Sequence, residues 1–321
     1  MLKLLIVKTS SLGDVVHNLP VVADIIAHHP HVQIDWLVEE SFADIPRLHP
    51  RVNRVITIAL RRWRKALFTR QTWAEMAVAK KQIAAEKYDL IIDTQGLIKS
   101  GLVSMLANGV RHGYNKKSIR EPLASHCYQV THAVSRRLHA VIRNRTLVAS
   151  ALNYAAPTDL PNYGITAKTN ADVAFKQPYV VGLHGTSRDS KLWPTDHWIT
   201  LGKALAVKQL QLVLPWASAA EFTRATEIAS KLNNATVLPK CSIAQLAGII
   251  ANAKTAIGVD TGLSHLSVAL NIPTIAIYTD TNPARTGVFA GAHAPAINLG
   301  NVNIIPSAEE VMQALATIYP Q

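Results

Sequence analysis

Short β-branched apolar runs alternate with longer amphipathic stretches along most of the chain. This pattern predicts βαβ units, in which helices cover both faces of a parallel sheet. The predicted strands are Lys3–Lys8, Gln33–Val38, Val55–Ile58, Leu90–Asp93, Tyr179–His184, Leu210–Leu214, Ala256–Val259 and Thr274–Tyr278. The predicted helices are Asp14–Ala27, Thr72–Glu86, Leu97–Leu106, Ser135–Asn153, Thr195–Val207, Ala219–Asn233, Ile243–Asn252 and Gly262–Ala269. The fold class is therefore α/β.

The alternation stops at one place, where prolines and polar residues follow one another without an apolar period. This stretch predicts a linker at residues 156–177, between Rossmann-like domains at 1–155 and 178–321. Two such domains commonly bind ligands between them, beyond the carboxyl ends of their strands. We therefore expect two domains facing a central cleft, with the site residues in loops that follow strands.

Composition narrows the class of protein. The 321 residues are 49% hydrophobic and 17% charged, which is too apolar for a disordered chain. The two cysteines, Cys127 and Cys241, can form neither a disulfide framework nor a metal-binding spacing, and this favours a reducing compartment such as the cytoplasm. The apolar run near the amino end spans four residues, so we expect any membrane association to be peripheral.

The formal net charge of +12 is unevenly distributed. Residues 61–145 carry 17 Lys and Arg against 5 Asp and Glu, whereas the rest of the chain is balanced. Such a segment suits nucleic acid, a membrane surface or an acidic substrate. An aromatic content of 6% and the absence of a helix-turn-helix or RNA-binding motif speak against nucleic acid.

The loop after the first predicted strand is the first candidate site. It offers the hydroxyl of Ser11, the glycine Gly13 and the carboxylate of Asp14 at the start of a helix. These groups suit an anion or a sugar, although Ser11 or Asp14 can equally serve as a helix cap. The loop lacks both the dinucleotide-binding glycine pattern and the P-loop pattern.

The loop after the strand at 179–184 is the second candidate. Gly185 allows close backbone approach, Thr186 and Ser187 offer short donors, and Lys191 supplies a positive charge. This combination suits a diphosphate. The alternative is a solvated loop in which Thr195 caps the next helix.

Two further loops follow strands of the second half. Glu221 can accept hydrogen bonds from both hydroxyls of a ribose, or can simply complement a helix dipole. In the other loop, Asp260 can bind sugar hydroxyls, and Thr261 and Gly262 can present N–H groups to phosphate. His265 either lines this pocket or is an ordinary buried side chain.

The sequence resembles the ADP-heptose:lipopolysaccharide heptosyltransferases of glycosyltransferase family 9 over nearly its whole length. The matching motifs lie at residues 8–17 (KTSSLGDVVH), 93–97 (DTQGL), 118–124 (SIREPLA), 189–194 (DSKLWP) and 258–265 (GVDTGLSH). The first and third motifs favour the type I enzymes over type II. The resemblance implies a GT-B fold, an acceptor-binding N-terminal domain and a donor-binding C-terminal domain.

The implied reaction is inverting transfer of L-glycero-D-manno-heptose from ADP-heptose to a Kdo of Kdo2-lipid A, with no cofactor and no required metal. No D-x-D motif occurs in the chain. The residues that match catalytic positions are Asp14, as general base, and Lys191. The residues that match donor contacts are Thr186, Ser187, Lys191, Glu221, Cys241, Asp260, Thr261, Gly262 and His265. Cys241 stands where methionine is expected beside the adenine, a contact that we expect to involve the backbone.

The basic segment gains a candidate partner from this resemblance, because Kdo carboxylates and lipid A phosphates are anionic. The expected acceptor contacts are Ser11, Gly13, Arg61, Arg62, Lys65, Gln95, Lys99 and Arg120. Arg136, Arg137, Arg143 and Arg145 lie on a predicted helix and are expected to be solvated or membrane-facing. We expect a monomer that binds no nucleic acid and lies peripherally on the cytoplasmic face of the inner membrane.

Two other enzymes stay open at this point. One is a type II heptosyltransferase, which acts on an already heptosylated core. The other is a two-domain nucleotide-sugar epimerase, which shares the architecture and the donor loops. A small soluble substrate would leave the basic segment without a role, and this disfavours the epimerase.

Overall fold

The computed structural model describes residues 1–168, 175 and 177–319, and it divides into two compact units, Met1–Ile165 and Thr166–Gln321. The division falls within the predicted linker 156–177, of which residues 169–174 and 176 lie outside the described residues. Two residues of that stretch, Tyr163 and Ile165, are buried and belong to the first unit.

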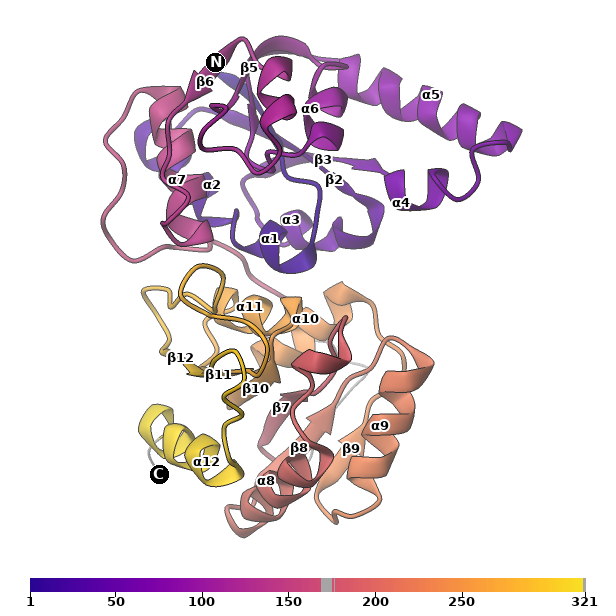
Figure 1. Cartoon of the computed structure of the whole chain (residues 1–321), viewed down its shortest axis with the longest axis vertical. Coiled ribbons are helices and arrows are strands. Elements are labelled where there is room, and N and C mark those ends of the chain that lie inside the picture. The colour runs from indigo at the N-terminus through magenta and orange to yellow at the C-terminus, as the bar shows by residue number, and fades with distance from the viewer. Residues whose placement is uncertain (169–174, 176, 320–321) are drawn as a thin grey trace. The chain divides into compact units, whose positions relative to one another are not determined.

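The N-terminal unit is built on one six-stranded parallel sheet with the order β3-β2-β1-β4-β5-β6 (Figure 1). Its strands are β1 (Lys3–Val7), β2 (Gln33–Glu39), β3 (Val52–Ile58), β4 (Lys87–Asp93), β5 (Asn108–Tyr114) and β6 (Val130–His132). Its α-helices are α1 (Leu12–Val16), α2 (Pro20–His28), α3 (Asp44–Arg47), α4 (Leu60–Trp63), α5 (Arg70–Ala84), α6 (Ile98–Ser104) and α7 (Ala140–Leu152). Short 3-10 turns lie at η1 (Glu40–Phe42) and η2 (Pro122–Cys127).

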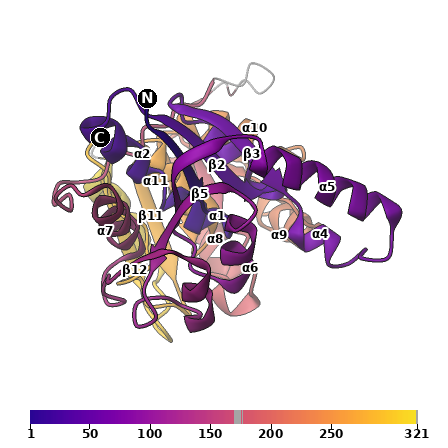
Figure 2. The same cartoon turned by 90° about the horizontal axis from the view of Figure 1, so that it is seen from above.

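Helices cover both faces of this sheet, and α5 and α7 lie on opposite sides of it (Figure 2). Leu5 and Val7 of β1 pack in a core with Ile83 of α5 and Val103 of α6. The alternate residues of the same strand, Leu4 and Ile6, are also fully buried. A strand buried on both faces reads as a continuous apolar run, and the sequence of β1 has that form.

The first predicted helix, Asp14–Ala27, is wrong as a single element. The structure ends α1 at Val16 and begins α2 at Pro20. Proline has no backbone N–H to donate within a helix, but it is well suited to a first turn, where that N–H would have no partner. Pro20 therefore starts a new helix.

The C-terminal unit repeats the same sheet order, β12-β11-β10-β7-β8-β9, again all parallel. Its strands are β7 (Tyr179–Leu183), β8 (Gln211–Leu214), β9 (Ala235–Val237), β10 (Thr255–Val259), β11 (Thr274–Tyr278) and β12 (Ala296–Gly300). Its helices are η3 (Asp189–Lys191), α8 (Thr195–Val207), α9 (Ala219–Ala229), α10 (Ile243–Ala251), α11 (Gly262–Ala269) and α12 (Ala308–Ile318). One core joins α8, α9 and α12 to this sheet, with Trp193, Trp198 and Ile257 fully buried.

Four strands, β5, β6, β9 and β12, were not predicted from the sequence. Three of them are edge strands, and β5 lies beside the edge strand β6. Edge strands bury fewer side chains, so their sequences lack the long apolar runs of the central strands. The helix predicted at Ser135–Asn153 begins later, at Ala140, and α12 was also missed.

Arg145 corrects a prediction for the basic helix. Instead of being solvated or membrane-facing, its guanidinium is buried and forms a two-bond ion pair with Asp24 of α2 at 2.8 Å for each bond. It also donates to the carbonyl and the carboxylate of Asp159. Arg145 therefore fastens α7 to α2. Arg136 and Arg137 are exposed and precede α7.

Within the described residues, no helix combines the length and the apolar character needed to cross a membrane.

Candidate functional site

Both sheets reverse their strand order beside their first strand. β1 pairs with β2 on one side and β4 on the other, and β7 lies between β8 and β10 in the same way. Open parallel sheets bind ligands beyond the carboxyl ends of their strands at such a reversal, because the two flanking loops turn away from each other there. The loops after β1 and β4, and those after β7 and β10, are therefore the candidate ligand-binding loops.

In the C-terminal unit, the loops after β7 and β10 meet at Asp260. Lys191 Nζ lies 2.5 Å from Asp260 Oδ2, and the two side chains are only 12% and 13% exposed. Thr186 Oγ1 donates to the Asp260 carbonyl oxygen at 2.9 Å. Three residues predicted separately from the sequence are thus brought together in one polar cluster.

The cluster lies at the amino end of α11, which begins at Gly262 with Thr261 as its N-cap residue. The side chain of Thr261 makes no capping hydrogen bond to the first turn of this helix. Its N–H groups and the helix dipole favour an anion at this end. Gly258, in the strand before it, leaves no room for a Cβ atom against Ser264 and Leu183, so the strand and helix pack closely.

Glu221 connects the loops after β7 and β8. Its Oε2 accepts from the N–H groups of Ala217 at 2.6 Å and Ser218 at 3.1 Å, so it caps α9. Its Oε1 lies against Gly185, where a Cβ atom would be only 2.6 Å away. The structure thus gives Glu221 the capping role and also places it beside the glycine of the diphosphate candidate loop.

The other predicted donor residues also follow strands of this sheet. Ser187 is exposed in the loop after β7, and His265 is buried in the first turn of α11. Cys241 lies between β9 and α10, where its Sγ donates to the carbonyl oxygen of Pro239 at 3.2 Å. Burial raises the pKa of the Cys241 thiol.

Two supporting residues of this cluster were not found from the sequence. Asp280, after β11, accepts from Ser190 Oγ at 2.6 Å, and Thr279 donates to the Ser190 carbonyl oxygen at 2.7 Å. These bonds hold the turn that carries Lys191. The sequence signal was weak, because an aspartate after a strand is common in loops.

His184 lies fully buried directly before Gly185. Burial, with a smaller effect of the Arg224 charge, lowers the pKa of His184 to about 4. The ring of His184 meets that of Trp198 edge to face, with ring centres 6.4 Å apart. A neutral imidazole thus lies beneath the loop that carries Thr186.

In the N-terminal unit, Asp14 lies in the first turn of α1. Its Oδ2 accepts from the Ser11 N–H at 2.8 Å and from Ser11 Oγ at 3.1 Å. Because both donors meet the same oxygen, the carboxylate is held in one orientation while its side chain stays partly exposed. Asp14 therefore caps the helix and presents a fixed, partly exposed carboxylate.

Lys8, directly after β1, is a candidate site residue that the sequence analysis did not single out. Its side chain is buried, and Nζ donates to the Thr94 carbonyl oxygen at 2.9 Å. Burial lowers the pKa of Lys8, while the charges of Asp14 and Asp93 oppose that shift. The available signal was a lysine placed directly after a fully apolar strand, where a surface residue would be unusual.

Gln95 and Lys99 complete the loop. Gln95 Oε1 accepts from the N–H groups of Thr9 and Ser10, both at 3.0 Å, and Lys99 Nζ donates to Ser10 Oγ at 3.0 Å. The structure thus brings together Ser11, Gly13, Asp14, Gln95 and Lys99 at the carboxyl ends of β1 and β4.

The other predicted acceptor residues lie outside the loops after β1 and β4, in α4 and just after it and in the segment before η2. Arg61 stacks over Phe42 at 5.0 Å, and Lys65 is exposed after α4. Arg62 forms ion pairs with Glu40 at 3.0 Å and Glu75 at 2.7 Å. The charge of Arg62 is therefore already balanced by two carboxylates.

Arg120 is exposed on the segment before η2. Its neighbour Glu121 accepts from the Ile98 N–H at 2.7 Å and so ties this segment to the start of α6.

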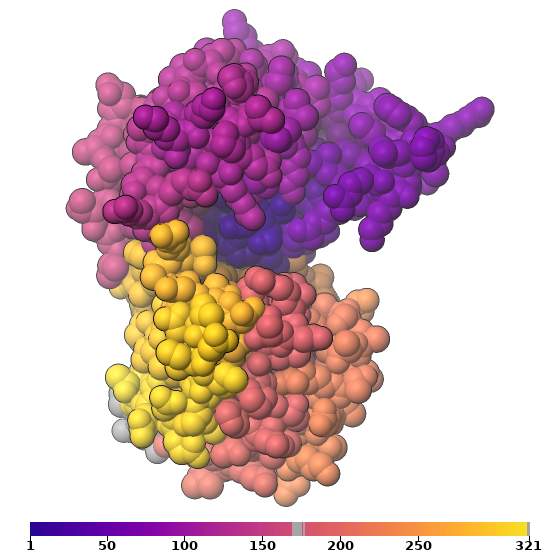
Figure 3. Space-filling view, in the orientation of Figure 1, coloured from indigo at the N-terminus to yellow at the C-terminus, as the bar shows by residue number. Residues whose placement is uncertain are grey.

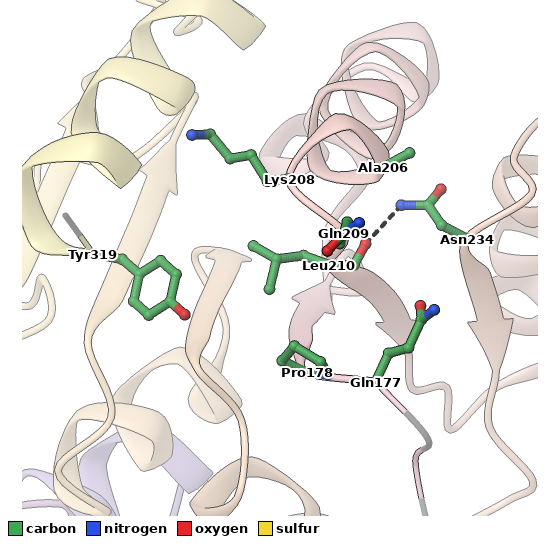
Figure 4. Close-up of a pocket in the computed structure, with 8 residues that line it drawn as sticks. All are labelled: Gln177, Pro178, Ala206, Lys208, Gln209, Leu210, Asn234 and Tyr319. Carbon is green, nitrogen blue, oxygen red and sulfur yellow. Dashed lines mark hydrogen bonds between the residues drawn. The ribbon is translucent and has the colours of Figure 1, made fainter. Parts of the chain in front are cut away.

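A cavity of about 390 Å³ opens in the C-terminal unit, but it lies at the amino ends of the strands (Figure 4). It is lined by residues that precede β7, β8 and β9 and by the ends of α8 and α12, namely Gln177, Pro178, Ala206, Lys208, Gln209, Leu210, Asn234 and Tyr319. None of the predicted donor residues lines it, so we do not assign it to the donor.

Across the residues that the structure describes, no three His, Cys, Asp or Glu side chains are grouped so that they could hold a metal ion.

Comparison with known proteins gives a consistent family. A sequence model of glycosyltransferase family 9 (heptosyltransferase) matches residues 76–316. Lipopolysaccharide heptosyltransferase 1 of Escherichia coli K12 is 42% identical over 324 residues, covering 99% of this chain and 100% of that protein.

Two solved structures of Escherichia coli heptosyltransferase WaaC are also similar. The one with ADP has a TM-score of 0.91 and 40% identity, and it covers 98% of this chain and 99% of that one. The one with ADP-2-deoxy-2-fluoro heptose has a TM-score of 0.88 and 39% identity, with the same coverage.

Proposed function

Because the chain belongs to glycosyltransferase family 9, the heptosyltransferases, we propose that it transfers heptose from ADP-heptose in synthesis of the lipopolysaccharide inner core, as a type I enzyme. The observation that carries this function is the cluster of Lys191, Asp260 and Thr186 at the amino end of α11. A cation beside an uncapped helix end suits the diphosphate of a nucleotide sugar. The similar Escherichia coli protein was solved with ADP and with an ADP-heptose analogue, which supports this choice of donor.

The donor lies in the C-terminal unit. The N–H groups of Thr186, Ser187, Thr261 and Gly262 and the ammonium of Lys191 bind the diphosphate, and Glu221 accepts from the ribose hydroxyls. Asp260 and His265 line the pocket of the heptose, and the backbone at Cys241 contacts the adenine. The position of Glu221 against Gly185 supports its role, because it brings the ribose carboxylate close to the diphosphate loop.

The acceptor lies in the N-terminal unit. Ser11, Gly13, Gln95 and Lys99 surround the reacting hydroxyl, since their loop is fixed at the carboxyl ends of β1 and β4. Arg61, Lys65 and Arg120, which are exposed, bind acidic groups of the acceptor further out. Arg62 contributes less than its charge suggests, because Glu40 and Glu75 already neutralise it.

Asp14 is the general base. It takes the proton of an acceptor hydroxyl as that oxygen attacks the anomeric carbon of the heptose, and the bond from that carbon to the ADP oxygen breaks. Inversion follows, since the attacking oxygen and the leaving ADP are on opposite faces of that carbon. The two bonds from Ser11 to Oδ2 support this role by fixing the carboxylate.

Negative charge develops on ADP as it leaves. The Lys191 ammonium, which is bonded to Asp260, donates a further hydrogen bond to the diphosphate and offsets part of its negative charge. The N–H groups at the start of α11 provide further donors. These groups lie in place before the reaction, so little reorganisation is needed. We propose that this arrangement stabilises the leaving group without a metal ion.

The acceptor is the Kdo of Kdo2-lipid A, and the protein acts as a monomer at the cytoplasmic face of the inner membrane. The excess of cations between residues 61 and 145 supports this choice, since lipid A phosphates, Kdo carboxylates and the membrane surface are all anionic. The C-terminal half is nearly neutral, since a few groups, such as Lys191 and the N–H groups at the start of α11, are enough to bind the nucleotide.

The direct test is a mass-spectrometric assay of heptose addition to Kdo2-lipid A by the purified protein with ADP-heptose. We expect a product heavier by one heptose. Transfer only to an already heptosylated core would assign the type II reaction instead. Turnover of UDP-N-acetylglucosamine without an acceptor would assign an epimerase.

A further inference from the structure

The hairpin formed by α4 and α5 exposes apolar side chains at its end. We call residues 64–70 together with Trp73 the hairpin tip. Phe68 is fully exposed, Trp73 is 60% exposed and Leu67 is 44% exposed. The hairpin projects from the N-terminal unit in both ribbon views, and the space-filling view shows it as the outermost part of that unit (Figures 1, 2 and 3). Exposed aromatic side chains gathered at one projection indicate an interaction surface.

Hydrogen bonds hold these side chains outward. Trp73 Nε1 donates to the Leu67 carbonyl oxygen at 2.9 Å, which fixes the turn before α5. Thr69 accepts from the Thr72 N–H at 3.3 Å and caps the same helix. Phe68 lies between these two anchors, so its exposure is set by the fold of the tip.

The base of the hairpin is braced as well. Arg62 of α4 bonds to Glu75 of α5 at 2.7 Å, and Trp63 Nε1 donates to the same carboxylate at 2.8 Å. These bonds, with that of Trp63 chiefly responsible, lower the pKa of Glu75. A braced hairpin presents its tip without first having to be ordered.

Cations surround the apolar tip. Arg64, Lys65 and Arg70 are exposed, and none of them forms an ion pair with another residue that the structure describes. Aromatic and apolar side chains ringed by Lys and Arg match the chemistry of an anionic bilayer surface, where rings enter the interface and cations meet the head groups. A second copy of this tip fits poorly, because it would bring like charges together.

We propose that the hairpin tip is a membrane anchor that inserts Phe68 and Leu67 into the interface of an anionic bilayer. This inference rests on the proposed function, in which the acceptor is a membrane lipid, and it adds an apolar contact to the electrostatic one. Arg61 and Arg62 lie in α4 at the base of the hairpin, so insertion would hold the basic segment 61–145 at the surface that carries the acceptor.

Vesicle binding tests the anchor directly. Sedimentation with vesicles of phosphatidylglycerol and phosphatidylcholine is expected to show about tenfold weaker partitioning of Phe68→Ser than of the unmodified protein, because a ring that was buried in the interface is lost. Val207→Ser, which removes an 85% exposed side chain at the end of α8, is the matched control and should bind normally. Equal partitioning of Phe68→Ser and the unmodified protein would overturn the proposal.

Insertion depth gives a second, independent readout. Phe68→Trp places an indole at the tip, and brominated lipids in the same vesicles should quench its added fluorescence. Val207→Trp should show no added quenching. Lack of quenching for Phe68→Trp would mean that the ring stays in water, and the anchor would be refuted even if charge alone still held the protein to the vesicles.

Activity separates this inference from the proposed function. Phe68→Ser should raise the KM for Kdo2-lipid A in vesicles and leave transfer to a deacylated, soluble acceptor unchanged. If the unmodified protein transfers heptose to neither acceptor, the proposed function fails, while the vesicle results still judge the anchor. If the unmodified protein is a dimer by analytical ultracentrifugation and Phe68→Ser is a monomer, the tip is a contact between copies and the anchor is wrong.

Discussion

At the scale of single residues, we propose the carboxylate of Asp14 as the general base of the reaction. Asp14→Asn keeps an oxygen for the two Ser11 donors but removes the base, so we expect kcat to fall by about 10²–10⁴-fold. Binding of ADP-heptose, measured by calorimetry, should be unchanged. Asp44→Asn, at a half-buried position of the same unit that pairs with Arg47, is the control. Near-normal turnover of Asp14→Asn would show that another group takes the proton.

In the C-terminal unit, we propose that Lys191 stabilises the leaving ADP. Lys191→Ala leaves Asp260 without its cation and removes a donor to the leaving ADP, so we expect kcat to fall by about 10²–10³-fold. Steady-state kinetics with varied ADP-heptose should also show a higher KM for the donor. Lys203→Ala, on the exposed side of α8, should have neither effect. An unchanged kcat for Lys191→Ala would remove Lys191 from the mechanism.

His184 makes stability depend on pH. Its folded pKa of about 4 lies below its ordinary value of 6.5, so between these values the unfolded chain binds more protons than the folded one. The free energy of unfolding should therefore fall as the pH drops from 6.5 to 4, by roughly 3 kcal/mol from this residue, and no further below pH 4.

Denaturant unfolding across that range measures this slope. His184→Gln should show a shallower dependence on pH whatever its stability at neutral pH, and the exposed His126→Gln should retain the original dependence. An unchanged slope in His184→Gln would mean that His184 binds protons equally well in both states.

Candidate site residues in the loops after strands were predictable from the sequence where charged, hydroxyl and glycine residues occur together. The sequence singled out Lys191, Asp260 and Thr186 separately, and the structure joins them by bonds of 2.5 and 2.9 Å. Asp280 and Lys8 were missed because their roles depend on neighbours distant in sequence, Ser190 and Thr94. A pattern along the chain does not contain those contacts. The catalytic and binding roles of these residues stay predictions.

At the scale of elements, the ion pair between α2 and α7 is the clearest case of a structural charge. Arg145→Met leaves the carboxylate of Asp24 buried without a partner, so we expect a loss of about 3–5 kcal/mol in the free energy of unfolding. The double variant with Asp24→Leu should recover much of that loss, because an apolar pair replaces the ion pair.

Guanidinium unfolding of the single and double variants tests this pairing. Arg136→Met, at an exposed position before α7, is the matched control and should change stability little. A loss of less than 1 kcal/mol for Arg145→Met would contradict a tight buried pair.

The central strands other than β5 were predicted from the sequence, whereas of the four edge strands only β3 was. β1, β7 and β10 are buried on both faces, and each is visible in the sequence as a continuous apolar run. β6 has three residues, Val130, Thr131 and His132, of which two are exposed, so no alternation is visible. The break between α1 and α2 was missed although Pro20 marked it, because the apolar period continues across the break.

At the scale of the whole molecule, the α/β fold class and the heptosyltransferase function predicted from sequence are confirmed. The predicted domain boundaries and the roles of the two domains stay predictions. The segment 61–145, whose 17 Lys and Arg exceed its 5 Asp and Glu, lies in the unit that carries Asp14, which is the unit we assign to the acceptor.

The leaving-group arrangement predicts that activity does not depend on added metal. Transfer measured in excess EDTA should match transfer without it, because in the proposed arrangement Lys191 and the N–H groups at the start of α11 stabilise the negative charge on the leaving ADP. Readdition of Mg²⁺ should then make little difference. A complete loss in EDTA that Mg²⁺ restores would require a metal at the diphosphate.

The two sheets share one strand order, and each carries its own set of polar loops at the same reversal point. The hydrogen bonds described for the Lys191 cluster join residues of the second unit, and those described for Asp14 join residues of the first. Selection can therefore act on the halves separately. Descendants of such a chain can change which saccharide they extend while they inherit the nucleotide pocket intact, so diversity among relatives should accumulate faster in the first half than at the donor loops of the second.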